Sequence, residues 1–418
     1  MKNKIQILLL IFVISSGAVA SLDVNGSIRI AQQSGVGTRA AAMANNYVAL
    51  SNDLSGLFWN PAGIAFSPVR EFQTSLEGTR LNSESKYFGT GQFDDMQRMK
   101  ISGAGLMIAI PATQGGLTVA GAFQNPIIFD EISSYKGRYL DIDNRIIEVE
   151  HQLKNSGGLR LWSAGVGLQI APSLAAGLAL SLISGKDDAV DNYMDIIDND
   201  LYSENNKIEG KYFGYDLRLG MMYRTDLFGA GIRFCIPQII KLREWNNGDR
   251  MGEALMYSSY SGAGGFSFSL PFVTVSVEGR ATLPLDYLFP SEPIPSNSQA
   301  SRFKKGGGIG LEFPMIVVPV LLRLGYSYDD LDLYQYVIRY EDENGSRFFD
   351  WHDNYGYVDQ GIEVDKNRQQ LTAGLGFFNS SASFDISYGY QFWSIITRKN
   401  LKQDYNTHRV STSLAIRF

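Results

Sequence analysis

The chain has 418 residues, with 43 glycines, 44% hydrophobic, 12% aromatic and 19% charged residues. Its apolar content is too high, and its net charge of −6 too small, for an intrinsically disordered protein, and no basic block indicates nucleic-acid binding. Soluble domains usually carry about 25% charged residues, so this chain is short of charge for that class.

The first twenty residues have the three parts of a secretory signal peptide. Lys2 and Lys4 form a basic start, residues 5–14 are apolar, and Ala18-Val19-Ala20 is a cleavage site of the A-x-A type. We expect cleavage after this motif, so that the mature chain starts at Ser21. An uncleaved N-terminal anchor is the alternative.

The mature chain contains no apolar run long enough for a membrane-spanning helix, which needs about 20 residues. A closed β-barrel is then the only remaining way to cross a membrane, because backbone polar groups must be satisfied within the hydrocarbon. The single cysteine, Cys235, leaves an exported protein without an internal disulfide. A mature barrel of this kind is expected in the outer membrane of a Gram-negative-type bacterium.

Residues 21–69 show no strand pattern and contain three short motifs. These are Ser34-Gly35-Val36-Gly37-Thr38-Arg39-Ala40, Ala49-Leu50-Ser51-Asn52-Asp53 and Phe58-Trp59-Asn60-Pro61-Ala62-Gly63. Gly35 and Gly37 allow backbone conformations that a Cβ atom would block, and Asn60-Pro61 is typical of a turn. A disordered leader is the alternative, but the segment is too apolar for one.

These motifs resemble the start of mature proteins in the FadL/TodX-type family of outer-membrane transporters for hydrophobic compounds. That family opens with a G-x-x-R-A stretch, an A-x-x-D-D stretch and an Asn-Pro-Ala motif, and here Asn52-Asp53 stands in place of the Asp pair. The resemblance implies that residues 21–69 are a hatch that plugs a barrel. Its motif residues are Gly35, Gly37, Arg39, Asp53, Asn60, Pro61, Ala62 and Gly63.

From residue 70 to 418, segments of about ten residues alternate between apolar and small or polar side chains. In the last one, Val410, Leu414 and Ile416 alternate with small and charged residues such as Arg409, which places the two sets on opposite faces of a strand. Fourteen segments follow this pattern, approximately 71–81, 98–110, 116–125, 158–171, 173–185, 210–224, 227–236, 258–269, 272–283, 302–313, 317–329, 367–378, 381–392 and 408–418.

The polar faces of these segments carry many charges, which a dry sandwich core would not accept. A water-containing barrel lumen can hold them. We therefore predict an all-β fold, a transmembrane antiparallel β-barrel of 14 strands over residues 70–418, with the hatch inside its lumen.

The connections between these segments alternate between short links and long polar stretches. We expect the long stretches to be external loops, as outer-membrane barrels have short periplasmic turns and longer loops outside. The predicted long loops are 82–97, 126–157, 186–209, 237–257, 284–301, 330–366 and 393–407.

Charged residues on the polar faces predict an internal network that fixes the hatch, and a charge-selective pore is the alternative. Arg39 of the hatch is the natural partner for a carboxylate of the wall. The predicted lumen charges are Asp216, Arg218, Glu278, Arg280, Glu312, Arg323, Asp385, Arg409 and Arg417.

The family resemblance also implies that loops at the outer face catch the cargo, which leaves through a lateral gap at a kinked third strand. The third predicted strand reaches Asn125 and Pro126. Because proline removes a ladder donor, these residues are the candidate gap, and plain termination of the strand is the alternative. The candidate capture residues in the long loops are Ile128, Phe129, Phe289, Phe348, Phe349 and Trp351.

No convincing catalytic or metal-binding set is present, so we expect neither an enzyme nor a cofactor. The Asp-His pair at His352 has the composition of a solvated loop, and His408 alternates onto the opposite face from Ser411 and Ser413. Acidic runs such as 195–200 match no calcium-loop spacing.

The function that the resemblance implies is passive uptake of long-chain fatty acids or aromatic hydrocarbons by lateral diffusion. A structural or accessory barrel, for example a subunit of a protein secretion system, is the alternative, because relatives with the same hatch motif include such barrels. The expected partners are membrane lipids and lipopolysaccharide, a hydrophobic cargo, and the barrel-assembly machinery through the terminal Phe418, but no nucleic acid. An apolar lining between hatch and barrel favours the channel, and a lumen filled solely by charges favours the accessory barrel.

Overall fold

The computed structural model describes residues 32–33, 35–67, 69–111, 115–140, 145–197, 200–283, 303–315, 318–330, 336–341, 347–352, 363–364, 367–397 and 401–418. The predicted signal peptide and its cleavage site lie outside these residues.

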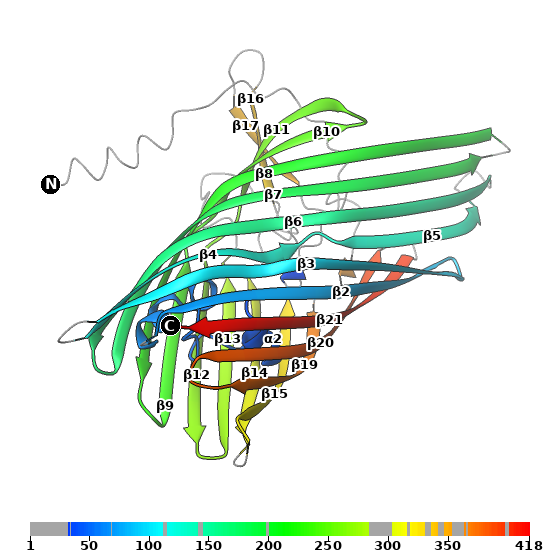
Figure 1. Cartoon of the computed structure of the whole chain (residues 1–418). Helices are drawn as coiled ribbons and strands as arrows, with labels where there is room; N and C mark the ends of the chain where they lie inside the picture. The colour runs from blue at the N-terminus through cyan, green and yellow to red at the C-terminus, as the bar shows by residue number, and fades with distance from the viewer. Residues whose placement is uncertain are drawn as a thin grey trace.

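The chain forms a closed antiparallel barrel of fourteen strands, which confirms the predicted fold class (Figure 1). The wall strands are β2 (Glu71–Tyr87), β3 (Thr90–Pro111), β4 (Gly116–Ile128), β6 (Ile146–Ala171), β7 (Leu174–Ile197), β8 (Asp200–Arg224), β9 (Phe228–Cys235), β12 (Ser261–Leu270), β13 (Val273–Thr282), β14 (Lys304–Pro314), β15 (Val320–Asp330), β19 (Asn367–Phe378), β20 (Ala382–Thr397) and β21 (Leu401–Arg417). The first and last of them, β2 and β21, pair along their whole length and close the wall.

Shorter strands extend this wall. They are β5 (Glu131–Leu140), which follows β4, β10 (Ile239–Asn246), which follows β9, β11 (Asp249–Tyr257), which precedes β12, and the two-residue strands β1 (Gln32–Gln33) and β18 (Glu363–Val364). A separate hairpin consists of β16 (Tyr336–Glu341) and β17 (Arg347–His352). We call the end at which β21 finishes the C-terminal rim, and the end at which β2 turns into β3 the opposite rim.

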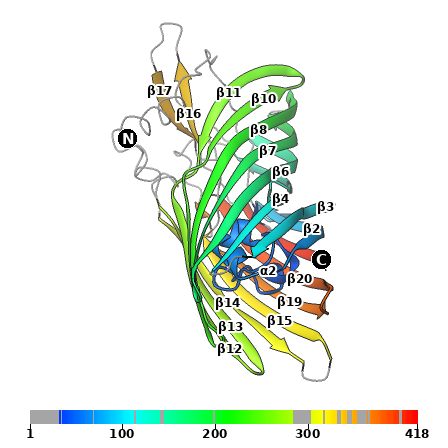
Figure 2. The ribbon, with the colours of Figure 1, turned by 60° about the vertical axis from the view of Figure 1, so that its left-hand side comes forward.

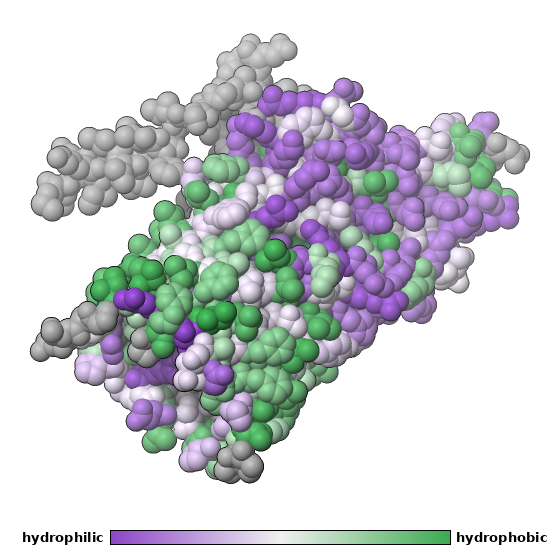
Figure 3. Space-filling model, in the orientation of Figure 1, coloured by the Kyte–Doolittle hydropathy of each residue, from purple (hydrophilic) through white to green (hydrophobic). Residues whose placement is uncertain are grey.

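The two faces of the wall follow the alternation in the sequence. In β21, Val410 is 46% exposed on the outside, whereas Arg409 is 3% exposed on the inside. The same split runs through the other strands, so that large apolar side chains cover the outer face of the barrel. Figure 3 shows these apolar residues gathered over the barrel and polar residues over the strands that run past it.

The predicted long loops are largely wrong, because most of these polar stretches continue as strands. Residues 82–97 form a hairpin that turns at Phe88 and Gly89, β7 and β8 run on to residues 197 and 200, and β20 and β21 to 397 and 401. Residues 126–157 contain β5 and the start of β6, and residues 237–257 contain β10 and β11. In Figure 1 these strands run far beyond the rest of the wall. The change to polar residues marks the end of the apolar band and not the end of the strand, because ladder hydrogen bonds do not depend on side-chain polarity.

Inside the wall lies an internal segment, residues 35–67, which carries α2 (Thr38–Ala42), α3 (Gly56–Trp59) and the 3-10 helix η1 (Pro61–Phe66). Nearly all of its side chains are buried, and Figure 2 shows it surrounded by the strands. Among the described residues, no helix has both the length and the hydrophobicity that a membrane crossing needs.

Candidate functional site

The internal segment is held in shape by its own motif residues. Gly35 and Gly37 have φ angles of 82° and 85°, in the region that favours glycine. The Asn60 side chain accepts a hydrogen bond from the Ala62 N–H at 3.1 Å and so caps η1, which begins at Pro61. A Cβ atom on Gly63 would lie 1.5 Å from the backbone oxygen of Ser51, so only glycine fits there.

Arg39 joins the internal segment to the wall. Its guanidinium donates to both carboxylate oxygens of Glu312 at 3.0 Å, a bidentate geometry that is among the stronger polar contacts in proteins. It also donates to Asn52 at 2.9 Å and to the Tyr47 hydroxyl at 3.2 Å. The Tyr47 hydroxyl in turn donates to Asp53 at 2.9 Å. Burial raises the pKa of Tyr47 well above its usual value, so the phenol stays protonated and can keep donating.

Replacing Arg39 by alanine should loosen the internal segment, because the bidentate bond to Glu312 is lost. Hydrogen bonds to charged groups are worth about 1.5–3 kcal/mol, so we expect the ion leak of liposomes carrying the variant to rise roughly tenfold. Arg39→Lys should lie between the variant and the natural protein, since a lysine keeps the charge but not the fork. An unchanged leak for Arg39→Ala would rule out this anchoring role.

Further hydrogen bonds tie the backbone of the segment to the wall. Glu278 accepts from the N–H groups of Tyr47 and Val48, each at 2.8 Å. The guanidinium groups of Arg218 and Arg233 donate to the carbonyl of Phe58 at 3.0 and 3.2 Å. Arg218 also lies over the Phe58 ring, 3.9 Å from its centre. The wall charges thus satisfy backbone groups that the short helices leave unpaired.

The predicted lumen charges come together in several ion pairs rather than in one network. These are Asp216–Arg218 at 2.7 Å, Glu278–Arg280 at 3.7 Å, Glu312–Arg323 at 2.6 Å, and Arg323 with Asp385. The sequence reading missed the partners of three arginines. Arg280 also pairs with Asp329 at 3.3 Å, Arg409 with Glu77 at 3.5 Å, and Arg417 with Glu71 at 3.0 Å. Both glutamates occupy the inner face of β2, and the alternation of residues 71–81 could have identified them.

Glycines on the inner wall let the internal segment approach closely. A Cβ on Gly177 would lie 2.2 Å from the carbonyl carbon of Pro61, and one on Gly325 would lie 2.3 Å from that of Met43. Side chains at these positions would therefore push the segment away from the wall. Wall glycines with such a contact are Gly165, Gly167, Gly177, Gly220, Gly231, Gly308, Gly310, Gly325 and Gly374.

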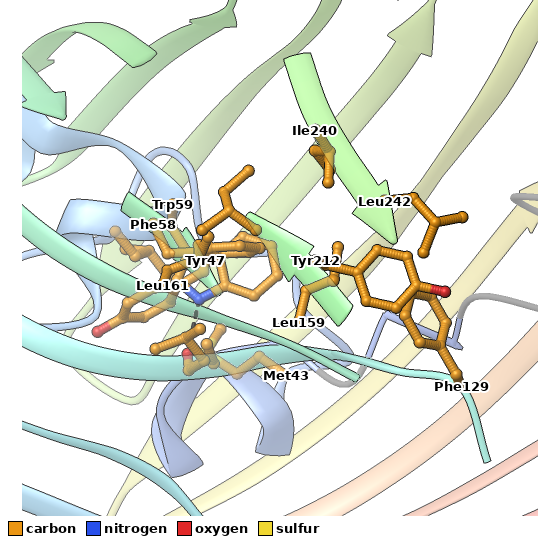
Figure 4. Packing of buried hydrophobic residues seen from close by; sticks show 14 residues of the cluster. Met43, Tyr47, Phe58, Trp59, Phe129, Leu159, Leu161, Tyr212, Ile240 and Leu242 are labelled. Atoms are coloured by element: carbon orange, nitrogen blue, oxygen red, sulfur yellow. Dashed lines mark hydrogen bonds between the residues drawn. The ribbon is translucent and has the colours of Figure 1, made fainter. Parts of the chain in front are cut away.

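An apolar cluster joins one side of the internal segment to the inner wall. It continues past the segment toward the opposite rim, where the Phe129 and Tyr212 rings lie 5.4 Å apart. Figure 4 shows these two rings beside Leu242, with the rings of Tyr47, Phe58 and Trp59 at the other end of the cluster. The cluster members are Val36, Ala40, Met43, Tyr47, Leu50, Phe58, Trp59, Phe129, Leu159, Leu161, Ile183, Tyr212, Ile240 and Leu242.

The candidate gap residues, Asn125 and Pro126, lie within β4 and not at its end. They form an irregularity in the pairing with β6, which passes from Gln124↔Leu161 to Ile127↔Leu159. Pairing between β3 and β4 stops at Gly103↔Gln124, although β3 continues to Thr90. Beyond that point β5 runs close to β3 and β2, but the described strands show no ladder between β5 and either of them.

We call this unpaired line between residues 90–102 of β3 and residues 125–134 the seam. The two-residue strand β1 pairs with β4 at the start of the seam, Gln33 with Ile127 and Gln32 with Ile128. The beginning of the internal segment therefore reaches the place where β3 and β4 part.

The structure does not place the candidate capture residues together in loops. Ile128 belongs to β4 and Phe129 follows it, and both are buried, because the chain continues inward as β5 instead of leaving as a loop. Phe348, Phe349 and Trp351 belong to β17, whose side chains are not among those described. Phe289 lies outside the described residues.

The histidine positions agree with the face assigned from sequence. His408 lies on the outer face, where its ring accepts or donates a hydrogen bond to the Tyr388 hydroxyl at 2.7 Å. Ser411 and Ser413 are buried on the inner face. In the described part of the chain, no three His, Cys, Asp or Glu side chains are grouped so that they could hold a metal ion.

The features above define a class of protein, the closed antiparallel barrel whose lumen holds its own N-terminal segment. Solved structures of similar fold include a Pseudomonas aeruginosa FadL homologue (11% identity over 94% of this chain and 99% of that chain, TM-score 0.58) and the P. putida toluene transporter TodX (12%, 93% and 99%, TM-score 0.56). The Ralstonia pickettii toluene transporter TbuX is similar to the same degree (11%, 93% and 99%, TM-score 0.56). No protein-family model matches the chain, and no curated protein sequence matches it. At these identities the likeness establishes the shared fold.

Proposed function

We propose that this chain is an outer-membrane channel for the passive uptake of hydrophobic small molecules. The observation that carries the proposal is the apolar cluster, because it lines the inner wall next to the internal segment. A lumen used only to hold a plug, or an accessory barrel of a secretion system, would need no apolar inner surface. The printed names of the structural neighbours, toluene transporters and a FadL homologue, favour the same function.

The outer-membrane location rests on the apolar outer band (Figure 3), the predicted signal peptide and the shared fold. In this setting the C-terminal rim faces the periplasm and the polar strand extensions stand outside the cell. Lipids and lipopolysaccharide then contact the outer face, and the barrel-assembly machinery recognises the terminal Phe418.

The proposed route uses three features in order. A long-chain fatty acid or an aromatic hydrocarbon is caught at the opposite rim and then enters the apolar cluster, where each buried methylene group is worth about 0.8 kcal/mol. The internal segment blocks the straight path to the periplasm, so the cargo leaves sideways at the seam into the hydrocarbon of the membrane. No energy source is needed, since the cargo is more stable in lipid than in water.

Uptake of radiolabelled oleate and toluene by cells with and without the gene tests this function. We expect faster uptake of at least one compound when the gene is present, and the preferred compound identifies the cargo class. Equal uptake of both compounds with and without the gene would refute the transport function.

Replacing Leu161 by asparagine should slow transport while leaving the barrel folded. Leu161 is buried in the apolar cluster, and an amide of similar volume there lacks the apolar surface that the cargo would contact. An unpaired polar group costs about 1–3 kcal/mol, so we expect transport to fall roughly tenfold or more. Leu153→Asn is the matched control, because Leu153 is buried on the same strand but lies outside the cluster. Equal rates for the two variants would argue against passage along the cluster.

A further inference from the structure

The seam is bridged by side chains where the backbone ladder is missing. Arg98 of β3 forms an ion pair with Asp130, which lies between β4 and β5. Asp130 also accepts from the Gly157 N–H at 3.1 Å, and Arg98 donates to the Gly157 carbonyl at 2.9 Å. Asp130 is 5% exposed, so the pair is held out of water and fixed to β6 as well.

Two further contacts cross the seam on either side of this pair. Lys100 donates to the carbonyl of Asn125 at 2.9 Å. Asp94 accepts from both the N–H and the hydroxyl of Ser134, at 2.7 and 2.6 Å. Every one of these bonds uses a side chain of β3, and each reaches a different point along residues 125–134.

A wall joined in this way opens differently from a wall joined by a ladder. A ladder separates only when several adjacent backbone bonds break together, and each exposed N–H or C=O group then lacks a partner. The seam separates when three side chains rotate, while β3 keeps its pairing with β2 and β5 keeps its pairing with β6. Among the described strand neighbours, the seam is therefore the line along which the wall parts most easily.

We propose that the ion pair between Arg98 and Asp130 is a latch that sets how often the seam opens, and so regulates the sideways exit of the cargo. The inference rests on the proposed channel function for its consequence, but the latch itself is a property of the wall. Asp130 is the central group, because it binds β3 and β6 at once. Its loss removes the contact that crosses the seam and leaves the Arg98 guanidinium without its carboxylate.

The opening can be measured as a distance, without any transport. Spin labels on cysteines at Phe93 of β3 and Lys136 of β5, both exposed, report the separation of the two sides in the full chain reconstituted into liposomes. The native Cys235 is buried and is left in place. Asp130→Asn should at least double the fraction of molecules with long separations. Glu148→Gln is the matched control, because it breaks the exposed pair between Glu148 and Arg138 (3.2 Å) on the outer face, and it should match the natural protein.

A second arm locks the seam and follows transport. Cysteines at Asp94 and Ser134, joined by a short reducible bifunctional thiol reagent, should reduce oleate or toluene transfer at least tenfold, and a reductant should restore it. Cysteines at the paired positions Glu84 and Phe93 of β2 and β3 are the control and should leave transfer unchanged when joined. Unaltered distances in a folded Asp130→Asn variant would overturn the latch. Altered distances without transfer of either compound in any variant would leave the latch standing and refute the channel function.

Discussion

Replacing Arg323 by methionine should destabilise the barrel and release the internal segment more strongly than any other single charge change. Arg323 is 2% exposed and donates to Glu312 at 2.6 Å, and it also pairs with Asp385. Glu312 in turn holds Arg39. Breaking a buried ion pair by removing one partner costs about 3–5 kcal/mol, because the remaining charge stays buried without compensation. The variant removes the central partner of two carboxylates at once, so we expect the upper part of this range.

The measurement is thermal unfolding of the detergent-solubilised barrel together with the ion leak of liposomes that carry it. Arg138→Met is the matched control, since Arg138 forms an exposed pair with Glu148, and such pairs are worth about 0.2–1 kcal/mol. We expect a clear loss of thermal stability and a raised leak for the Arg323 variant and almost none for the control. Similar unfolding temperatures for the two variants would show that the buried pairs do not anchor the fold.

The barrel could be predicted from the sequence because alternation is a direct record of the two environments of a wall. Val410 and Arg409 have adjacent positions and opposite faces, and a period of two has no other simple explanation in a chain with this many inward charges. The ends of the strands could not be predicted in the same way. Residues 186–209 lose the apolar face where the hydrophobic band ends, but β7 and β8 continue because their backbones still pair.

The candidate site was predicted only in part, since local patterns do not specify contacts between distant strands. Arg39 and Glu312 could be assigned separately as hatch and lumen charges, and their pairing depends on the closed wall. Pro126 marked an irregular strand, but its partner strand does not reveal that β3 and β4 part there. Asp130 has no distinguishing sequence context at all, because its partner Arg98 lies in a stretch that reads as a polar loop.

The glycines of the inner wall make a second prediction of large effect, in which Gly177→Val forces the internal segment out of its place. A Cβ atom at this position would lie 2.2–2.4 Å from backbone atoms of Pro61 and Ala62, and the backbone cannot yield as a flexible side chain could. Valine itself suits a strand, so β7 should still form. Overpacking of this kind costs about 1–3 kcal/mol, which corresponds to a roughly 5- to 150-fold change in the equilibrium between a seated and a displaced segment.

Gly279→Val is the matched control for Gly177→Val, because a Cβ on Gly279 in β13 would meet no atom within 4 Å. The two variants add the same side chain to a wall strand and differ only in what lies behind it. We expect the Gly177 variant to raise ion leak through liposomes and to expose the internal segment to protease, whereas the Gly279 variant behaves like the natural protein. If both variants stay equally tight, the internal segment is held by its ion pairs alone. If both leak, the loss of glycine weakens the strands themselves, and the close approach of Pro61 is not what keeps the lumen shut.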